Sequence, residues 1–173
     1  MTTEERLEKL EKELADMKER IRSKSFELVD DKGKLRALLG VSTINNTCVF
    51  GLCDKNGKVR IRLTVDESGP ELVLYDELDN VRAGLGVDKS KTSLAFGDEQ
   101  GKLRVTLGIV EKRPALMLMD ENGKTRVTLF ASDLGSFLEL YGIKEESSVG
   151  MSIIIDPKLT LKNEKGKQIW SAP

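Results

Sequence analysis

Residues 94–109 read LAFGDEQGKLRVTLGI, and four further stretches of the chain repeat this pattern. These are FELVDDKGKLRALLGV (26–41), FGLCDKNGKVRIRLTV (50–65), LVLYDELDNVRAGLGV (72–87) and LMLMDENGKTRVTLFA (116–131). Two weaker copies follow, LELYGIKEESSVGMSI (138–153) and LTLKNEKGKQIW (159–170). Corresponding turn positions recur at intervals of 24, 22, 22, 22, 22 and 21 residues. Seven units of about 22 residues therefore fill the chain from Ser25 onward.

Each unit contains two segments in which apolar residues alternate with other residues. Leu94 and Phe96 represent the first segment, and Val105 and Leu107 the second. A period of two is typical of a β-strand. The segments are separated by Asp-x-x-Gly-Lys, in which Asp accepts a backbone N–H in a type I turn and Gly takes the left-handed conformation. Each unit is predicted to be strand, tight turn, strand, which gives about fourteen short strands.

The pairing register of the two strands in a unit is left open by the sequence. A hairpin with a bulge at the Gly places Leu118 beside Arg126, which mixes the two sets of apolar residues. A hairpin without that bulge pairs Leu116 with Val127 and gives a cleaner apolar face.

An amphipathic helix is predicted for residues 4–24, which contain neither Gly nor Pro. Its apolar residues recur at steps of three and four, as in the seam of a coiled coil. They are Leu7, Leu10, Leu14, Met17 and Ile21. In a parallel, in-register assembly, Arg6 of one helix faces Glu11 of its neighbour. Likewise, Glu13 faces Lys18, so we expect these helices to associate in parallel. The alternative is a helix that docks on its own domain.

The composition argues against catalysis. The chain has 173 residues, 28 Lys plus Arg against 29 Asp plus Glu, two Cys and no His, with 39% apolar and 5% aromatic residues. Without His, the commonest general base and the commonest metal ligand are missing. We expect no catalytic residue, no cofactor and no metal site. Cys48 and Cys53 are interpreted as free thiols, because their odd spacing points them to opposite faces of a strand.

The N-terminus, MTTEERLEKL, is rich in charged residues and lacks the apolar segment of a signal peptide. We therefore expect a cytoplasmic protein or a component of a virion or similar particle, with no membrane partner. A net charge of −1 gives no general attraction to phosphate. Nucleic acid is accordingly not the expected partner.

An Asp and an Arg recur six residues apart in the first five units. The Arg residues are Arg36, Arg60, Arg82, Arg104 and Arg126, and they follow Asp30, Asp54, Asp76, Asp98 and Asp120. The favoured interpretation is structural, with each Asp capping its turn and each Arg pairing with an acidic neighbour. The alternative is a basic stripe for a polyanion such as a sulfated glycan.

The last two units lose both recurring charges. Gly142 and Ser148 replace the Asp and Arg in the sixth unit, and Asn163 and Ile169 replace them in the seventh. Terminal repeats often depart from the consensus because they cap the stack. Residues 136–173 are therefore predicted to form a cap in which Trp170 covers the end. Alternatively, this tip is where a protein or glycan ligand binds.

The recurring Leu-x-Leu-x-Asp-x-x-Gly-Lys-x-Arg-x-x-Leu-Gly-Val unit resembles a group of uncharacterised bacterial repeat proteins. Residues 25–130 carry that resemblance, which implies no activity. A short coiled coil followed by β-repeats is also similar, in layout alone, to trimeric fibre proteins of phage tails and bacterial surfaces.

Together these features predict an all-β protein behind a coiled-coil helix (1–24), with a regular β-repeat body (25–135) and degenerate C-terminal repeats (136–173). We expect three chains to close the repeats into a β-prism or intertwined β-helix, because a lone meander leaves long edges and an uncovered face. A monomeric β-solenoid is the alternative fold. The expected function is a non-catalytic, homotrimeric structural or adhesive fibre module. The alternative function is an intracellular scaffold whose repeats bind a protein or polyanion.

Overall fold

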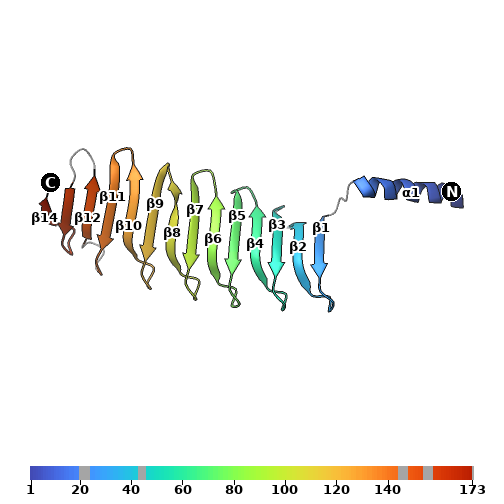
Figure 1. The fold of residues 1–173 in the computed structure, drawn as a ribbon, viewed down its shortest axis with the longest axis horizontal. Coiled ribbons are helices and arrows are strands. Elements are labelled where there is room, and N and C mark those ends of the chain that lie inside the picture. The colour runs from blue at the N-terminus through green and yellow to red at the C-terminus, as the bar shows by residue number, and fades with distance from the viewer. Residues whose placement is uncertain (20–23, 43–45, 144–147, 154–157, 173) are drawn as a thin grey trace.

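The chain forms one helix followed by a single sheet (Figure 1). The computed structural model describes residues 1–19, 24–42, 46–143, 148–153 and 158–172. The helix α1 spans Thr3–Glu19. It begins with a capping box, in which the Thr2 hydroxyl accepts the N–H of Glu5 at 3.2 Å and the Thr2 N–H donates to the Glu5 carboxylate at 2.7 Å.

Fourteen strands follow α1, each five to eight residues long. They are β1 (Ser25–Val29), β2 (Leu35–Val41), β3 (Cys48–Cys53), β4 (Val59–Val65), β5 (Pro70–Tyr75), β6 (Val81–Val87), β7 (Lys91–Gly97), β8 (Leu103–Val110), β9 (Arg113–Met119), β10 (Thr125–Ser132), β11 (Gly135–Tyr141), β12 (Ser148–Ile153), β13 (Lys158–Lys162) and β14 (Gln168–Ala172).

The strands pair in chain order from β1 to β14, and each pair is antiparallel. The sheet is therefore a continuous meander (Figure 1). This confirms the prediction of an all-β repeat body behind one short helix. A meander of this kind differs from the solenoid alternative, in which the chain winds in coils. The sheet continues from β10 to β11, across the predicted start of the degenerate repeats.

The turn inside each unit has the predicted chemistry. In the fifth unit the N–H of Asp120 donates to the carbonyl of Lys124 at 2.9 Å, and the N–H of Gly123 donates to the carbonyl of Asp120 at 3.0 Å. Gly123 has a φ of 79°. This is a type I turn followed by a left-handed residue, as the Gly position requires. In the third unit Asp79 replaces Gly and adopts a φ of 65°.

A second irregularity beside the turn corrects both registers considered from the sequence. Met119 pairs with Thr125, but Leu118 pairs with Val127, so Arg126 has no partner position on β9. This β-bulge shifts β10 by one residue. Because the shift restores the pairing of apolar with apolar positions, the Gly turn is compatible with one apolar face.

Six of the seven units contain such a shift. The residues skipped are Arg36, Arg60, Arg82, Arg104 and Arg126, and Ile169 in the last unit. The described pairing of β11 with β12 runs without a shift. The recurring Arg therefore marks the bulge position of the repeat.

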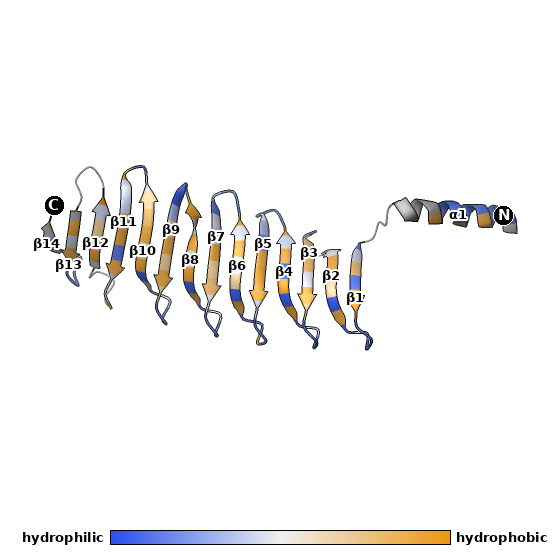
Figure 2. Cartoon of the chain, in the orientation of Figure 1, coloured by the Kyte–Doolittle hydropathy of each residue, from blue (hydrophilic) through white to orange (hydrophobic). Residues whose placement is uncertain are grey.

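The bulges bring three rows of mainly apolar residues to one side of the sheet, here called the apolar face, although single apolar residues such as Val73, Met117 and Phe130 lie on the opposite side. Its middle row follows the strand-to-strand pairing through the whole sheet. The row consists of Phe26, Leu39, Phe50, Leu63, Leu72, Leu85, Leu94, Leu107, Leu116, Leu129, Leu138, Met151, Leu159 and Ala172. Figure 2 shows the apolar strands between hydrophilic turns.

The apolar face is not covered by the described part of the chain. Among those residues, Ala37 is the buried hydrophobic side chain of this face, at 8% exposure, and Val73 is buried on the opposite side, at 3%. No large side chain of the described residues is fully buried. Leu107, in the middle row, is 51% exposed. A sheet normally packs its apolar side against another layer. The fold thus lacks the buried core that a compact domain of this length contains.

The turn glycines give a direct test of the local structure. Gly57 has a φ of 85° and open space around the position of a Cβ atom, so Gly57→Ala adds backbone strain without a clash. We expect this change to lower the free energy of unfolding by about 1–2 kcal/mol. Gly86→Ala is the matched control, because a Cβ there also meets open space but φ is not left-handed. Equal effects in urea titrations would contradict the turn assignment.

Candidate functional site

Two surfaces stand out, and the first is the side of the sheet that carries the turns within the units. We call it the turn edge and define it by residues 30–34, 54–58, 76–80, 98–102, 120–124 and 163–167 together with the bulge residue after each turn. These turns lie along one long side of the sheet (Figure 1). The meander therefore brings the recurring Asp and Arg of successive units into one line.

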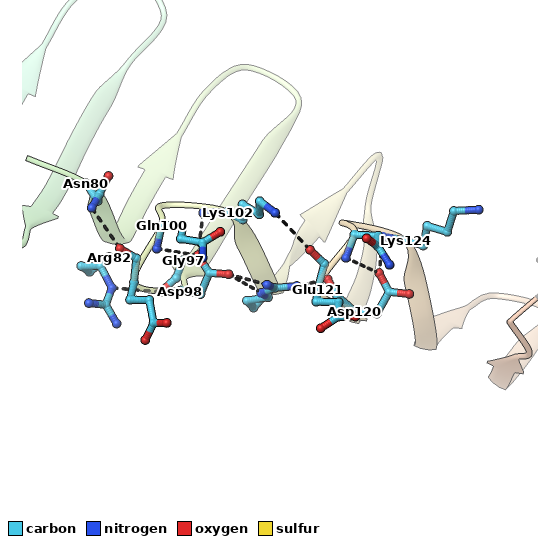
Figure 3. Close-up of polar contacts among 12 residues, drawn as sticks. Asn80, Arg82, Gly97, Asp98, Gln100, Lys102, Asp120, Glu121 and Lys124 are labelled. Carbon is cyan, nitrogen blue, oxygen red and sulfur yellow. Dashed lines mark hydrogen bonds and ion pairs between the residues drawn. The ribbon is translucent and has the colours of Figure 1, made fainter.

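Each Asp of the turn edge uses its two carboxylate oxygens differently. In the fourth unit, Oδ1 of Asp98 accepts the N–H groups of Gln100 at 2.9 Å and Lys102 at 3.0 Å. Oδ2 accepts from Nε of Arg104 at 2.8 Å (Figure 3). The same carboxylate thus fixes the turn and the bulge. The corresponding ion pairs are Arg36–Asp30 at 3.6 Å, Arg60–Asp54 at 3.2 Å, Arg82–Asp76 at 3.5 Å and Arg126–Asp120 at 2.6 Å.

The bulge Arg also connects one unit to the next. Nε of Arg82 donates to the carbonyl of Gly97 at 3.2 Å (Figure 3). The guanidinium of Arg104 donates to the carbonyl of Asp120, and that of Arg126 donates to the carbonyl of Gly142. Gly142 occupies the Asp position of the sixth unit, so the backbone contact persists where the carboxylate is lost. The bulge residue therefore bridges two turns as well as closing its own.

The residue at the Lys position of the turn makes a second connection between units. Nζ of Lys58 donates to the carbonyl of Glu77 at 2.9 Å and pairs with the Asp79 carboxylate at 3.1 Å. The amide of Asn80 donates to the carbonyl of Glu99 at 3.0 Å (Figure 3). Nζ of Lys102 donates to the carbonyl of Glu121 at 3.3 Å, which is the same contact one unit later.

These contacts lower the pKa values of the recurring Asp carboxyl groups on the turn edge. Partial desolvation raises the pKa of Asp98, but the N–H groups of Gln100 and Lys102 and the side chain of Arg104 more than offset it. The pKa of Asp98 therefore lies below its usual value of 3.8. The pKa is lowered in the same direction at Asp30, Asp54, Asp76 and Asp120.

These contacts bear on the two interpretations of the recurring charges. All five Arg residues of the proposed polyanion stripe lie on the turn edge, and each pairs with the Asp of its own unit. The paired carboxylate offsets the charge of each guanidinium, which weakens its attraction for an added anion. The geometry therefore favours the turn-stabilising role, and polyanion binding stays a prediction.

The second surface is the apolar face. Its middle row is flanked by one row nearer the turn edge and another nearer the opposite side. The near row is Leu28, Ala37, Leu52, Ile61, Leu74, Ala83, Phe96, Val105, Leu118, Val127, Leu140, Val149, Leu161 and Trp170. The far row is Val41, Cys48, Val65, Pro70, Val87, Thr92, Ile109, Pro114, Ala131, Ser136 and Ile153. A continuous apolar surface of this length marks an interaction site.

The predicted seam of the helix is likewise uncovered. Leu7, Leu10 and Leu14 are 59%, 54% and 56% exposed, and α1 contacts no strand within the described residues. The helix does not dock on its own sheet in this arrangement. Met17 belongs to α1, whereas Ile21 lies outside the described residues. In Figure 1, α1 lies beyond β1 and extends along the direction in which the strands are stacked.

The opposite side of the sheet, the polar face, carries mostly small side chains. Arg62 crosses it, pairing with Glu71 at 3.7 Å and lying 5.5 Å from the centre of the Tyr75 ring. Gly84 and Gly86 form part of the lining of a shallow hollow of about 470 Å³ beside these residues. Farther along the sheet, Phe130 and Phe137 stack with ring centres 4.5 Å apart.

The C-terminal repeats keep more of the pattern than the sequence indicated. Oδ1 of Asn163 accepts the N–H groups of Lys165 and Lys167, each at 3.0 Å, so Asn163 replaces the Asp of the turn. Ile169 takes the bulge position and is exposed. Trp170 is 46% exposed and lies on the apolar face. Asn shares the acceptor oxygen of Asp, and this is the signal that identifies the last turn.

Within the described ranges, no three His, Cys, Asp or Glu side chains gather as a metal site. Cys48 and Cys53 are both free thiols. No helix among the described residues has the length and apolar character needed to cross a membrane. No protein-family model matches this chain, and a search of curated proteins found no significant match.

The lowered Asp pKa values predict acid-sensitive stability. A folded-state pKa below the unfolded value means that the charged carboxylate stabilises the fold above pH 3.8, and this contribution is lost as the pH falls through the lowered value. Asp98→Asn keeps the turn acceptor but removes the charge that pairs with Arg104. We expect the variant to unfold at lower urea concentration at pH 7, and the difference from the natural protein to shrink toward pH 2.

The adjacent exposed residue supplies the control for this experiment. Glu99→Gln removes one negative charge from the same turn without breaking the Arg104 pair. Its urea midpoint is expected to change less than that of Asp98→Asn. If the two variants behave alike at every pH, the carboxylate contacts do not stabilise the turn edge.

Proposed function

We propose that this chain is a non-catalytic structural subunit of a homotrimeric shaft. In this assembly the apolar faces of the copies cover one another, and the leading helices associate as a parallel coiled coil. The observation that carries the proposal is the uncovered apolar face, which runs across all fourteen strands of the sheet. The following observations support it.

The exposed area of the chain is far larger than that of a compact monomer. Its accessible surface is 13314 Å², whereas a folded monomer of 19.2 kDa exposes about 8,400 Å². The excess is close to 5,000 Å² per chain, at the scale of obligate interfaces between subunits. Burial of the apolar face and of the seam of α1 against other copies reduces this excess.

The helix supports association between copies of the same chain. A helix in a protein gains most of its stability from packing of its apolar side, and the exposed seam of α1 has the narrow width of a coiled-coil interface. The charges beside the seam are complementary in a parallel pairing of identical helices, with Arg6 opposite Glu11. The same partner, a further copy of this chain, therefore suits both the helix and the sheet.

A shaft of this kind carries load or spaces other components, and its end is the natural place for an adhesive contact. Ile169 is exposed at the bulge of the last described strand, outside the rows of the apolar face, which favours a protein or glycan ligand there. Two reduced cysteines are compatible with a location in the cytoplasm or in the interior of a particle.

The turn edge supports a second candidate function, a scaffold that binds a protein or polyanionic partner. Its Arg and Lys side chains form a line along one side of the sheet. Retention on heparin at low salt, lost in a variant with Arg36, Arg60 and Arg82 changed to Gln, would favour this candidate. If the two proteins elute at the same salt concentration, polyanion binding by these Arg residues is excluded.

A pair of substitutions on one strand tests the shaft. Leu107 lies on the apolar face of β8, and the neighbouring Thr106 lies on the polar face. Leu107→Asp places charge in the proposed interface, and at micromolar concentration we expect it to remove most of the assembled species. Thr106→Asp is expected to retain the assembly. Light scattering after size-exclusion chromatography measures both. If the unmodified protein is a folded single chain, the proposal is wrong.

A further inference from the structure

We infer that the copies are arranged in parallel and without stagger, with the middle row of the apolar face directed at a threefold axis. This inference rests on the proposed function, because it specifies the partner of the apolar face as two further copies in one orientation. Four observations lead to it, concerning the width of the face, the composition of the middle row, the difference between the outer rows and the charges of the helix.

The width of the apolar face suits an assembly in which three sheets surround one axis. The three rows span four residue steps along a strand, or about 13 Å. Packed sheets lie about 10 Å apart, so each of three sheets around a threefold axis lies about 5 Å from that axis. An equilateral triangle with that spacing has a side of about 17 Å, which is wide enough for the three rows, while the ends of the longer strands extend past its corners. Two facing sheets of this width leave both long sides of the interface open to water.

The middle row has the uniformity expected at a symmetry axis. Ten of its fourteen residues are Leu: Leu39, Leu63, Leu72, Leu85, Leu94, Leu107, Leu116, Leu129, Leu138 and Leu159. A residue directed at the axis meets its own copies, so its size must suit three identical side chains at once. The outer rows meet different residues of a neighbour and vary much more.

The two outer residues of several strands differ in size, and that difference favours a parallel arrangement. In β3 and β7 the near residue is the larger of the two, as in Phe96 with Thr92, whereas in β2 and β6 the far residue is the larger, as in Ala37 with Val41. Rotation about an axis along the shaft places the near row of one chain against the far row of the next. Large side chains then meet small ones, as dense packing requires. An antiparallel arrangement instead places near rows against near rows, and the far rows, which hold Cys48, Thr92, Ala131 and Ser136, against one another.

The helix supplies the register that the repeats leave open. Sliding one sheet by a unit, about 10 Å, again matches the middle row with itself. This distance is close to one heptad of α-helix. A slip by one heptad places Glu13 of one helix against Glu11 of its neighbour, or Arg6 against Lys18. The in-register assembly instead pairs opposite charges, so α1 selects the unstaggered arrangement.

Spin labels on the polar face test this arrangement in the full-length protein. Single cysteines are introduced at Glu27 in β1 and at Thr106 in β8, each with Cys48→Ser and Cys53→Ser. Both positions lie on the polar face, away from the proposed interface. We expect a native mass of three times 19.2 kDa and the same inter-chain distance at both labels. In an antiparallel assembly, the Glu27 labels of opposed chains lie about 60 Å apart.

The possible results separate the inference from the proposed function. A mass of two or four chains, or unequal distances at the two labels, overturns the threefold parallel arrangement and the trimeric state proposed above, but leaves an oligomer that covers the apolar face. A folded single chain overturns both. Three chains with equal, short distances support both. A slip by one unit adds about 10 Å along the shaft at both labels. A distance that lengthens at both labels in Arg6→Glu, and recovers in Arg6→Glu, Glu11→Arg, shows that the helix sets the register.

Discussion

The position of each β-bulge determines which side of the sheet is apolar. A Gly turn alone pairs the strands of a unit so that apolar residues of one strand lie beside charged residues of the other. One extra residue on the second strand, at Arg126 in the fifth unit, brings Leu118 opposite Val127. Because side chains alternate along a strand, this shift of one residue moves a whole set to the other face. Without it, the apolar face would not be continuous.

The residue at the bulge is held by the carboxylate that also closes the turn. Asp98 accepts two backbone N–H groups with one oxygen and Arg104 with the other. Arg104 then reaches the carbonyl of Asp120 in the next unit. The polar contacts of the repeat thus lie mostly at the edge of the sheet, where they fix register without occupying the apolar face. That division leaves the face available to other copies of the chain.

Much of the fold follows from the spacing of residues. The period near 22, the alternation in Leu94–Phe96 and Val105–Ile109, and the Asp-x-x-Gly-Lys turns predicted the number and kind of the strands. The register did not follow, because a bulge depends on the conformation of one residue and Arg104 has no strong preference that marks it. Asn163 was interpreted as a lost Asp, although its amide oxygen performs the same task. The ties between units, such as Asn80 to Glu99, join residues whose proximity appears only once the strands are paired.

The central claim is that the sheet is stable because copies of the chain cover its apolar face. An assembly that folds as it associates gains stability with concentration, whereas a self-contained chain does not. The most direct measurement is therefore the urea midpoint of the full-length protein over a hundredfold range of concentration. The account predicts a midpoint that rises steadily with concentration. A midpoint that stays constant, with a cooperative transition and the mass of one chain, would contradict it.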